Sequence, residues 1–317
     1  MEKRRIGNSG LEIAPLMLGG NVFGWTADRE ASFAVLDAFV DAGYNAIDTA
    51  DVYSCWAPGN VGGESETVIG EWLHSRQARS QVVIATKIGG VFPDWSKGNL
   101  SKTHIIQGVE ASLNRLQTDY IDLYQSHVDD PVTPLDETLE AYDRLIQAGK
   151  VRTIGASYYS PARLGDAVEA SAKESRPRYE CMQTKYNLMD RNEFEGPLRD
   201  VCIDHGVGVT CMTSLAKGFL TGKYRSADEI AKSAWASNLQ RYATERGARV
   251  LAALHEVASP REAGLGEVAL AWLMAQPGVT AAIVAVDDVA QLREIIGAGS
   301  LQLSADELAL LTDAGAL

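Results

Sequence analysis

The sequence predicts a (β/α)8 barrel with a β-hairpin at its N-terminus. Eight short apolar runs of strand length recur along the 317 residues. Amphipathic stretches with a helical period separate these runs. Most polar residues that could do chemistry follow directly after a run, and the strand ends of such a barrel gather at one mouth. We therefore expect a single barrel domain over residues 1–317 with an active site at that mouth.

The chain opens with the pattern of a small hairpin. Residues Arg4–Pro15 alternate around Asn8-Ser9-Gly10, and these residue types favour tight turns. A hairpin there could cover the bottom of the barrel. The eight strands are expected, in chain order, at Leu16–Gly19, Ala46–Thr49, Val82–Thr86, Ile121–Gln125, Val151–Gly155, Cys181–Lys185, Val207–Met212 and Ala281–Val286. The clearest helices between them are expected at Ala31–Ala42, Glu64–Leu73, Ile105–Leu116 and Leu135–Ala148.

Two connections are longer than a barrel requires. They are Gly89–Lys102, after the third expected strand, and Tyr224–Arg246, after the seventh. Long loops at the mouth commonly form lids or specificity walls. Aromatic side chains on loops could line an apolar substrate pocket there, and the candidates are Trp25, Trp56 and Trp95, with Phe23 beside them. The alternative is that two or more of them only pack against the bases of the loops.

The composition is that of a globular protein and excludes several kinds of partner. A net charge of −13 argues against nucleic acid and against an anionic membrane surface. No apolar run approaches the ~18 residues of a membrane span, and the N-terminus lacks the pattern of a signal peptide. The four cysteines show no C-x-x-C spacing. We expect reduced thiols, no metal site and a cytoplasmic location.

Four residue types at successive strand ends indicate acid–base chemistry. Asp48 and Tyr53 accompany the end of the second strand, Lys87 follows the third and His127 follows the fourth. A phenol has a pKa near ~10, and a lysine held by a carboxylate would lower it. A neutral imidazole could orient a carbonyl group. Each residue alone has a plainer explanation, as a turn residue, a solvated lysine or a hydrogen-bonded core histidine, but their joint placement favours a site.

Other motifs are incomplete. Residues Gly218–Lys223 look like a phosphate loop but are one residue short, and Tyr224 stands where that motif needs Ser or Thr. No G-x-G-x-x-G, no G-x-S-x-G and no metal-type histidine spacing occurs. The sequence therefore gives no support to a Rossmann-type fold or to these other chemistries.

Over essentially its whole length the chain resembles the aldo-keto reductase family. The motifs that carry the resemblance are Asp48–Tyr53 (DTADVY), Ala85–Lys87 (ATK), Tyr124–His127 (YQSH), Gly149–Ser157 (GKVRTIGAS) and Leu215–Tyr224 (LAKGFLTGKY). The chain is similar to the bacterial branch of the family, which has a compact C-terminal tail.

The resemblance implies a nicotinamide-dependent carbonyl reductase. In that family pattern Tyr53 is the general acid in reduction and the base in the reverse direction, Lys87 and Asp48 tune it, and His127 orients the carbonyl. The cofactor lies extended across the strand ends. The residues implied in holding it are Ser157 and Gln183 at the carboxamide, Met212 at the nicotinamide ring, Thr213, Ser214, Leu215, Lys217 and Lys223 around the pyrophosphate, and Asp287, Gln291 and Glu294 at the adenosine end.

Three positions depart from the family pattern. Tyr158 stands where an Asn usually assists the carboxamide, and Met212 stands where an aromatic ring usually stacks on the nicotinamide, although a thioether can pack against a ring face. Asp287 lies near the place where many members put Arg or Ser against the 2′-phosphate of NADP(H), and its charge would repel that phosphate. The resemblance still slightly favours NADP(H) over NAD(H), with Arg225 or Lys232 reaching over from the long seventh loop.

Two functions from different classes stay open. The first is an enzyme that acts on a small-molecule aldehyde or ketone. The second is an NADP-binding redox-sensing or regulatory subunit with slow turnover, because some family members serve in that role. The four intact residues favour the enzyme. A barrel hydrolase or lyase would want paired carboxylates or a metal, and neither is expected at the strand ends. The sequence leaves the oligomeric state open.

Overall fold

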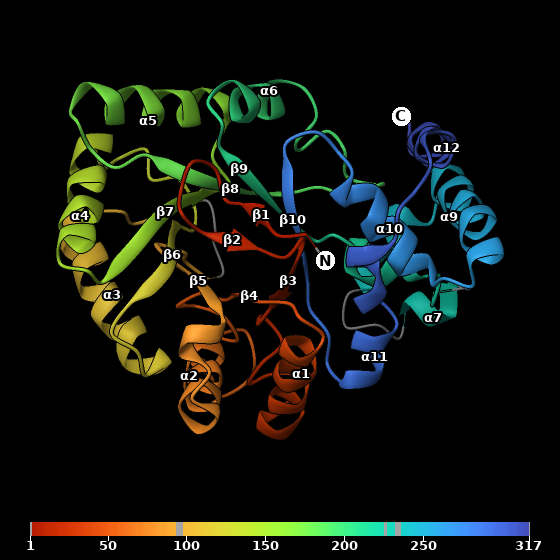
Figure 1. Ribbon diagram of the computed structural model, residues 1–317, viewed down its shortest axis with the longest axis horizontal. Helices are drawn as coiled ribbons and strands as arrows, with labels where there is room; N and C mark the ends of the chain where they lie inside the picture. The colour runs from red at the N-terminus through yellow and green to blue at the C-terminus, as the bar shows by residue number, and fades with distance from the viewer. Residues whose placement is uncertain (1, 93–97, 225–226, 232–235, 317) are drawn as a thin grey trace.

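Eight parallel strands close into a barrel in this computed structural model, which describes residues 2–92, 98–224, 227–231 and 236–316. The strands follow one another around the ring in chain order, and the last pairs with the first. They are β3 (Leu16–Gly19), β4 (Ala46–Asp48), β5 (Val83–Ile88), β6 (Ile121–Ser126), β7 (Val151–Ser157), β8 (Tyr179–Lys185), β9 (Gly208–Met212) and β10 (Val279–Val284). Figure 1 looks along the barrel with this ring near the centre. All eight expected strands are confirmed.

Helices cover the outside of the barrel (Figure 1). Local side chains set where several begin: the Asp28 side chain accepts a hydrogen bond from the amide of Ala31 at the start of α1, and Ser160 caps α5 in the same way. Such caps satisfy amides that the first helical turn leaves unpaired. The helices are α1 (Arg29–Asp41), α2 (Glu64–Arg76), α3 (Lys102–Leu116), α4 (Leu135–Gln147), α5 (Pro161–Lys173), α6 (Pro197–Asp204), α7 (Ala227–Ala231), α8 (Ala236–Leu239), α9 (Glu245–Ala258), α10 (Leu265–Met274), α11 (Val289–Arg293) and α12 (Ala305–Ala314).

The N-terminal hairpin closes one end of the barrel. Strands β1 (Arg4–Arg5) and β2 (Glu12–Ile13) pair antiparallel, and Figure 1 shows them in red in front of the ring. Ile6 and Leu11 of this hairpin belong to the same buried cluster as inward side chains of the strands, such as Met17. The hairpin therefore fills the bottom of the barrel with apolar side chains, as the sequence predicts, and leaves the opposite end as the mouth.

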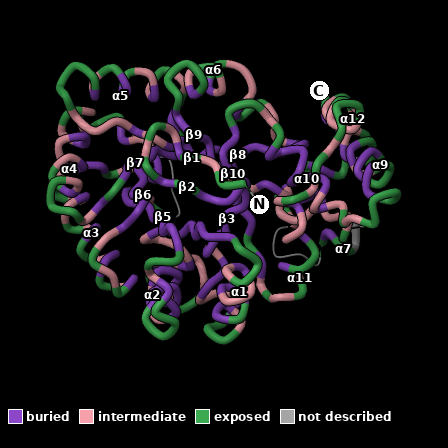
Figure 2. Tube along the Cα trace, viewed as in Figure 1, coloured by how far each residue is buried: buried purple, intermediate pink, exposed green. Residues whose placement is uncertain are grey.

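A second, larger apolar layer lies between the strands and the helices. Residues such as Leu36 of α1, Ile105 of α3 and Leu270 of α10 pack there with no exposed surface. Figure 2 shows the strands buried at the centre, while exposed residues gather on the outer turns of the helices. Among the described residues no helix is long and apolar enough to span a bilayer.

The structure adds detail at the loops and near the C-terminus. The connection Tyr224–Arg246 contains the short helices α7 and α8, and part of the connection Gly89–Lys102 lies outside the described residues. After β10 the chain forms only five helical residues, α11, and then continues through the 3-10 turn Ile296–Ser300 to α12.

Candidate active site

Adjacent strands bring the four predicted catalytic residues to one level of the mouth. Asp48 is the last residue of β4, Lys87 is next to last in β5, and His127 directly follows β6. In the register of the sheet, Asp48 pairs with Ala85, and Lys87 pairs with Gln125 on β6. Because these strands are parallel neighbours, their C-terminal side chains converge.

Lys87 lies at the centre of the group. Its ammonium donates hydrogen bonds to Asp48 Oδ2 at 2.7 Å, to the backbone oxygen of Thr49 at 2.8 Å and to the hydroxyl of Tyr53 at 2.9 Å. The Lys87 side chain has no exposed surface. The plainer explanation, a solvated lysine, is therefore wrong. His127 lies beside Tyr53, with their ring centroids 5.8 Å apart and the rings nearly perpendicular.

Burial sets the protonation of these groups. Burial, with the charge of Asp48 next, raises the pKa of Tyr53 well above its ordinary value. The direction is opposite to the one that the lysine alone predicts, because the cost of burying a phenolate outweighs the nearby ammonium. Burial, followed by the charge of Lys87, lowers the pKa of His127 well below its ordinary value. Tyr53 thus holds its proton at neutral pH, and His127 is a neutral imidazole, as predicted.

Two glutamines surround Asp48. The Gln183 amide donates to Asp48 Oδ1 at 2.8 Å, and the Gln125 amide approaches the same oxygen at 3.4 Å. Asp48 is therefore held on one oxygen by Lys87 and on the other by Gln183. Ser157 pairs with Gln183 across β7 and β8. The buried hydroxyl of Ser157 has no hydrogen-bond partner among the described residues, so it can still bind a polar group of a ligand.

Tyr158, directly after β7, and Lys185, at the end of β8, have features that the sequence alone did not reveal. Tyr158 has a positive φ of 54°, a conformation that suits Asn better than an aromatic residue. The residue is 47% exposed, and the centroid of its ring lies 6.0 Å from the Lys185 ammonium. Lys185 ends β8, two residues after Gln183, so both side chains project from the same side of the strand. In the sequence, the alternation of side-chain directions along this strand could have indicated that Lys185 lies on the same side as Gln183.

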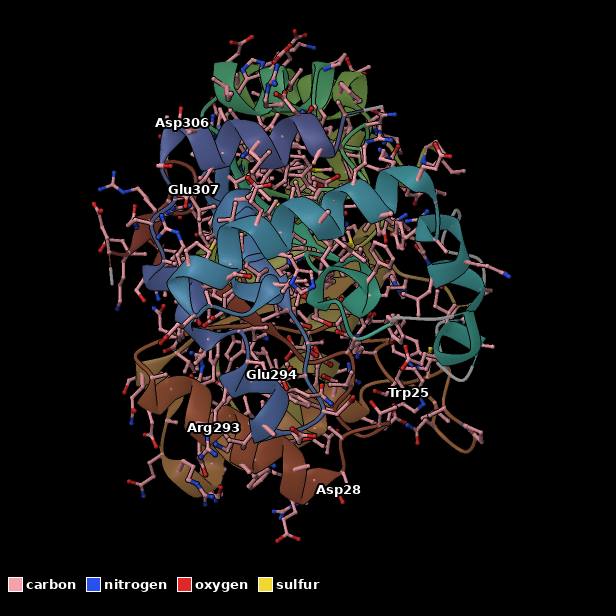
Figure 3. The ribbon with its side chains drawn as sticks, turned by 90° about the vertical axis from the view of Figure 1, so that its right-hand side faces the viewer. Trp25, Asp28, Arg293, Glu294, Asp306 and Glu307 are labelled. Atoms are coloured by element: carbon pink, nitrogen blue, oxygen red, sulfur yellow. The ribbon has the colours of Figure 1, made fainter. Side chains whose placement is uncertain are left out.

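Aromatic side chains form a wall next to Tyr53. Trp56 lies 6.0 Å from the Tyr53 ring, 5.6 Å from Trp25 and 6.3 Å from Phe92, measured between ring centroids. Phe92 is 46% exposed and was not among the expected substrate contacts. Phe23 is fully buried in the core and only supports its loop. Trp95 lies outside the described residues. In Figure 3, where the hairpin end is on the left, Trp25 lies toward the mouth on the right.

The segment after β9 has the backbone geometry of an anion site. Thr213, Ala216 and Lys217 have φ values of 59°, 49° and 56°, and Gly218 has 88°. Left-handed residues next to right-handed ones turn backbone N–H groups to one concave side, which binds anions. Burial, with the charge of Lys185 next, lowers the pKa of Lys217 to about 8. The remaining expected contacts lie on this segment: Met212 ends β9, Ser214 donates to the backbone oxygen of Cys211, Leu215 precedes the 3-10 turn Ala216–Thr221, and Lys223 is exposed.

The residues expected at the adenosine end lie on α11 or directly next to it. Asp288 caps this helix. The Asp287 side chain accepts a 2.5 Å hydrogen bond from the hydroxyl of Thr26 on the β3–α1 loop, while the Asp287 amide donates to Gln291 Oε1. Glu294 follows α11 and lies nearer the hairpin end than Trp25 does (Figure 3). Arg225 and Lys232 lie outside the described residues.

The arrangement can transfer a proton to or from an oxygen atom bound beside Tyr53. A buried ammonium is fixed between a carboxylate and a protonated phenol, and a neutral imidazole stands next to them. Within the described ranges, no cluster of three or more histidine, cysteine, aspartate or glutamate residues could hold a metal ion. The four cysteines are free thiols.

The sequence matches a family of oxidoreductases. Residues 15–316 match the Aldo/keto reductase family. The chain is 35% identical to the uncharacterized oxidoreductase YrpG of Bacillus subtilis, over 99% of this chain and 95% of the relative. It is 34% identical to the aldo-keto reductase AMT2 of Alternaria alternata, over 98% of this chain and 90% of the relative. It is 31% identical to a probable voltage-gated potassium channel subunit beta of Arabidopsis thaliana, over 93% of this chain and 90% of the relative.

Proposed function

The chain belongs to the aldo/keto reductase family of oxidoreductases, and we propose that it interconverts an aldehyde or ketone and its alcohol with NADPH or NADH. The observation that carries the proposal is the position of the Lys87 ammonium, 2.7 Å from Asp48 and 2.9 Å from the Tyr53 hydroxyl. A protonated phenol held in this way is a general acid.

Each of the four residues has a distinct part in this proposal. Tyr53 gives its proton to the carbonyl oxygen in reduction and takes it back in oxidation. Lys87 stabilises the phenolate that forms, and Asp48 keeps Lys87 charged and oriented. Neutral His127 donates a hydrogen bond that orients the carbonyl. Trp25, Trp56 and Phe92 would exclude water from the substrate and favour one with an apolar body.

The residues at the mouth fit a nicotinamide dinucleotide. When bound, the nicotinamide exchanges a hydride at its C4 atom with the carbonyl carbon. The unpartnered buried hydroxyl of Ser157 is a suitable donor to the carboxamide oxygen, and the side-chain oxygen of Gln183 would accept from the carboxamide nitrogen. Met212 can pack against the ring. The left-handed turn at Thr213–Gly218 would hold the pyrophosphate, and Lys223 would add positive charge.

We propose that the protein uses both NADPH and NADH, with weak discrimination that depends on Asp287. Amides at the start of α11 favour an anion, whereas the charges of Asp287 and Asp288 oppose one. A like charge near the 2′-phosphate costs on the order of 1 kcal/mol in a solvated site, or about fivefold to tenfold in affinity. Asp287→Arg should therefore tighten NADPH binding by about tenfold and leave NADH binding nearly unchanged, as measured by fluorescence titration.

A matched control separates the effect of the Asp287 charge from the effect of its hydrogen bond with Thr26. Asp287→Arg also breaks the hydrogen bond from Thr26, so Thr26→Val, which removes that bond and keeps the carboxylate, should leave the ratio of the two affinities unchanged. If Asp287→Arg alters neither affinity, Asp287 does not face the ribose.

A panel assay tests the proposed activity. Purified protein is supplied with NADPH or NADH and a series of aldehydes and ketones, and cofactor oxidation is followed by absorbance. We expect oxidation that depends on the carbonyl and gives the alcohol in equal amount. The panel should include aromatic and aliphatic members of similar size, because the Trp25–Trp56–Phe92 wall predicts that bulky apolar groups lower KM.

A regulatory subunit is the second candidate. The relative described as a probable voltage-gated potassium channel subunit beta is 31% identical over 93% of this chain, so related sequences also occur in proteins described as channel subunits. Tight cofactor binding with no carbonyl-dependent oxidation across the panel would favour that function over the enzyme.

A further inference from the structure

Asp51 is a half-buried residue next to the four residues described above. It lies in the β4–α2 loop between Asp48 and Tyr53, and its backbone amide donates to the backbone oxygen of Lys87 at 3.2 Å. One of its carboxyl oxygens, Oδ1, is buried and has no hydrogen-bond partner in the part of the chain that the structure describes. An ionised carboxylate with an unpartnered buried oxygen is costly. The motif DTADVY, in which Asp51 is the second acid, was the signal in the sequence.

The nearby cations are already engaged by other carboxylates. Arg115 of α3 forms an ion pair of 2.7 Å with Glu66 of α2, whose other oxygen accepts from Thr86 at 2.6 Å. Lys87 is paired with Asp48. Of these described groups, three carboxyls therefore share two cations, and Asp51 is the carboxyl that has neither as a direct partner.

Among the described groups around Asp51, only the already paired Arg115 and Lys87 carry a positive charge. The groups that interact with Asp51 electrostatically come from its own loop, from α2, α3 and α4, and from β5 and β6: Tyr53, Cys55, Glu66, Arg115, Tyr142, Lys87 and Tyr124. Burial, with the charge of Glu66 next, raises the pKa of Asp51 to about 8, against the weaker opposing effects of Arg115, of a hydrogen bond from the Val52 backbone and of Lys87.

We propose that Asp51 keeps a proton on its carboxyl group at neutral pH and is a positioning residue for the acid–base pair Lys87 and Tyr53. A neutral Asp51 leaves Asp48 as the carboxylate that acts on this pair. The inference rests on the proposed role of Tyr53 as proton donor.

Ionisation of Asp51 would hinder the deprotonation of Tyr53. A negative charge on Asp51 raises the pKa of Tyr53 and of Lys87. Alcohol oxidation needs the phenol to accept a proton, so its rate would rise with pH only at more alkaline values. Asp51→Asn has nearly the same shape and cannot ionise. We expect the pH profile of kcat/KM for oxidation to move to lower pH by about one unit in this variant.

Unfolding measurements provide a readout that does not depend on activity. The native pKa of about 8 exceeds the ordinary value of 3.8, so between these values the native state binds a proton that the unfolded state lacks. The contribution of Asp51 to the free energy of unfolding is therefore greatest below pH ~4. It falls as the pH rises toward 8 and is constant above that pH. The wild-type unfolding equilibrium constant, relative to that of Asp51→Asn, should increase by about tenfold per pH unit in this window.

Two further variants sharpen the experiment. Asp119→Asn makes the same chemical change at an exposed residue just before β6, at the end opposite the mouth, and should leave both readouts as in the wild type. Glu66→Gln removes the neighbouring negative charge and should lower the pKa of Asp51. The pH at which stability stops falling should therefore be lower in this variant. This variant tests the inference even if Asp51→Asn folds poorly.

The outcomes separate this inference from the proposed function. A pH dependence of stability that is the same in the wild type and in Asp51→Asn would show that Asp51 is ionised at neutral pH. An altered stability slope with an unchanged oxidation profile would rule out the positioning role. If no carbonyl compound is reduced at all, the proposed function fails, while the unfolding experiment still decides whether Asp51 holds its proton.

Discussion

Replacing Tyr53 by phenylalanine is expected to lower turnover by roughly 10²- to 10⁴-fold, the usual contribution of a positioned general acid. The substitution removes only the hydroxyl that Lys87 contacts at 2.9 Å. The ring remains to pack against Trp56 and His127. Cofactor affinity should therefore stay close to that of the wild type. Steady-state kinetics and cofactor titration on the same preparation measure the two quantities.

A matched removal of a phenol hydroxyl controls for general damage. Tyr120→Phe alters a tyrosine just before β6, at the hairpin end of the barrel, and should retain normal turnover. If Tyr53→Phe itself retains near wild-type turnover with an intact active site, Tyr53 is not the proton donor.

Lys87→Met is expected to cut the rate and to move the pH profile of alcohol oxidation upward. Without the ammonium, nothing at this position stabilises the phenolate, so the pKa of Tyr53, already raised by burial, rises further. The substitution also leaves Asp48 buried with Gln183 as its main remaining partner. Removing one member of a buried ion pair typically costs about 3–5 kcal/mol of stability, so denaturant unfolding should accompany the kinetics.

The control for Lys87 is a lysine outside the barrel. Lys173 at the end of α5 has a side chain that is 82% exposed, and Lys173→Met should change neither the rate nor the pH profile. An unchanged pH profile in Lys87→Met would mean that this lysine is structural rather than part of proton transfer.

The sequence predicted that Asp48, Tyr53, Lys87 and His127 lie together, because the fold determines where the strand ends meet. Apolar runs and helical periods located the strands, and residues at the ends of neighbouring parallel strands must meet at the mouth. Asp48, Lys87 and His127 are therefore brought together by chain order and register alone. The motif spacing then placed Tyr53 in the loop between them.

Properties that depend on three-dimensional burial could not be obtained from the sequence. The residue types suggested that Lys87 lowers the pKa of Tyr53, whereas burial of the phenol reverses the sign. The hydrogen bond from Gln183 to Asp48 joins β8 to β4 across the mouth, and no local pattern indicates which inward side chain it reaches. Phe92 was one of several aromatic residues in a long loop, and only the fold shows that its ring meets Trp56.

The most direct test of the central claim repeats the carbonyl panel with cofactor that carries deuterium at the transferred C4 position. The wild-type protein should deliver one deuterium to the carbinol carbon of the product for each cofactor oxidised, and Tyr53→Phe should deliver it at the much lower rate given above while binding the cofactor normally. Cofactor oxidation without deuterium in the alcohol, or a bound cofactor that stays reduced in the presence of every carbonyl compound, would contradict the account.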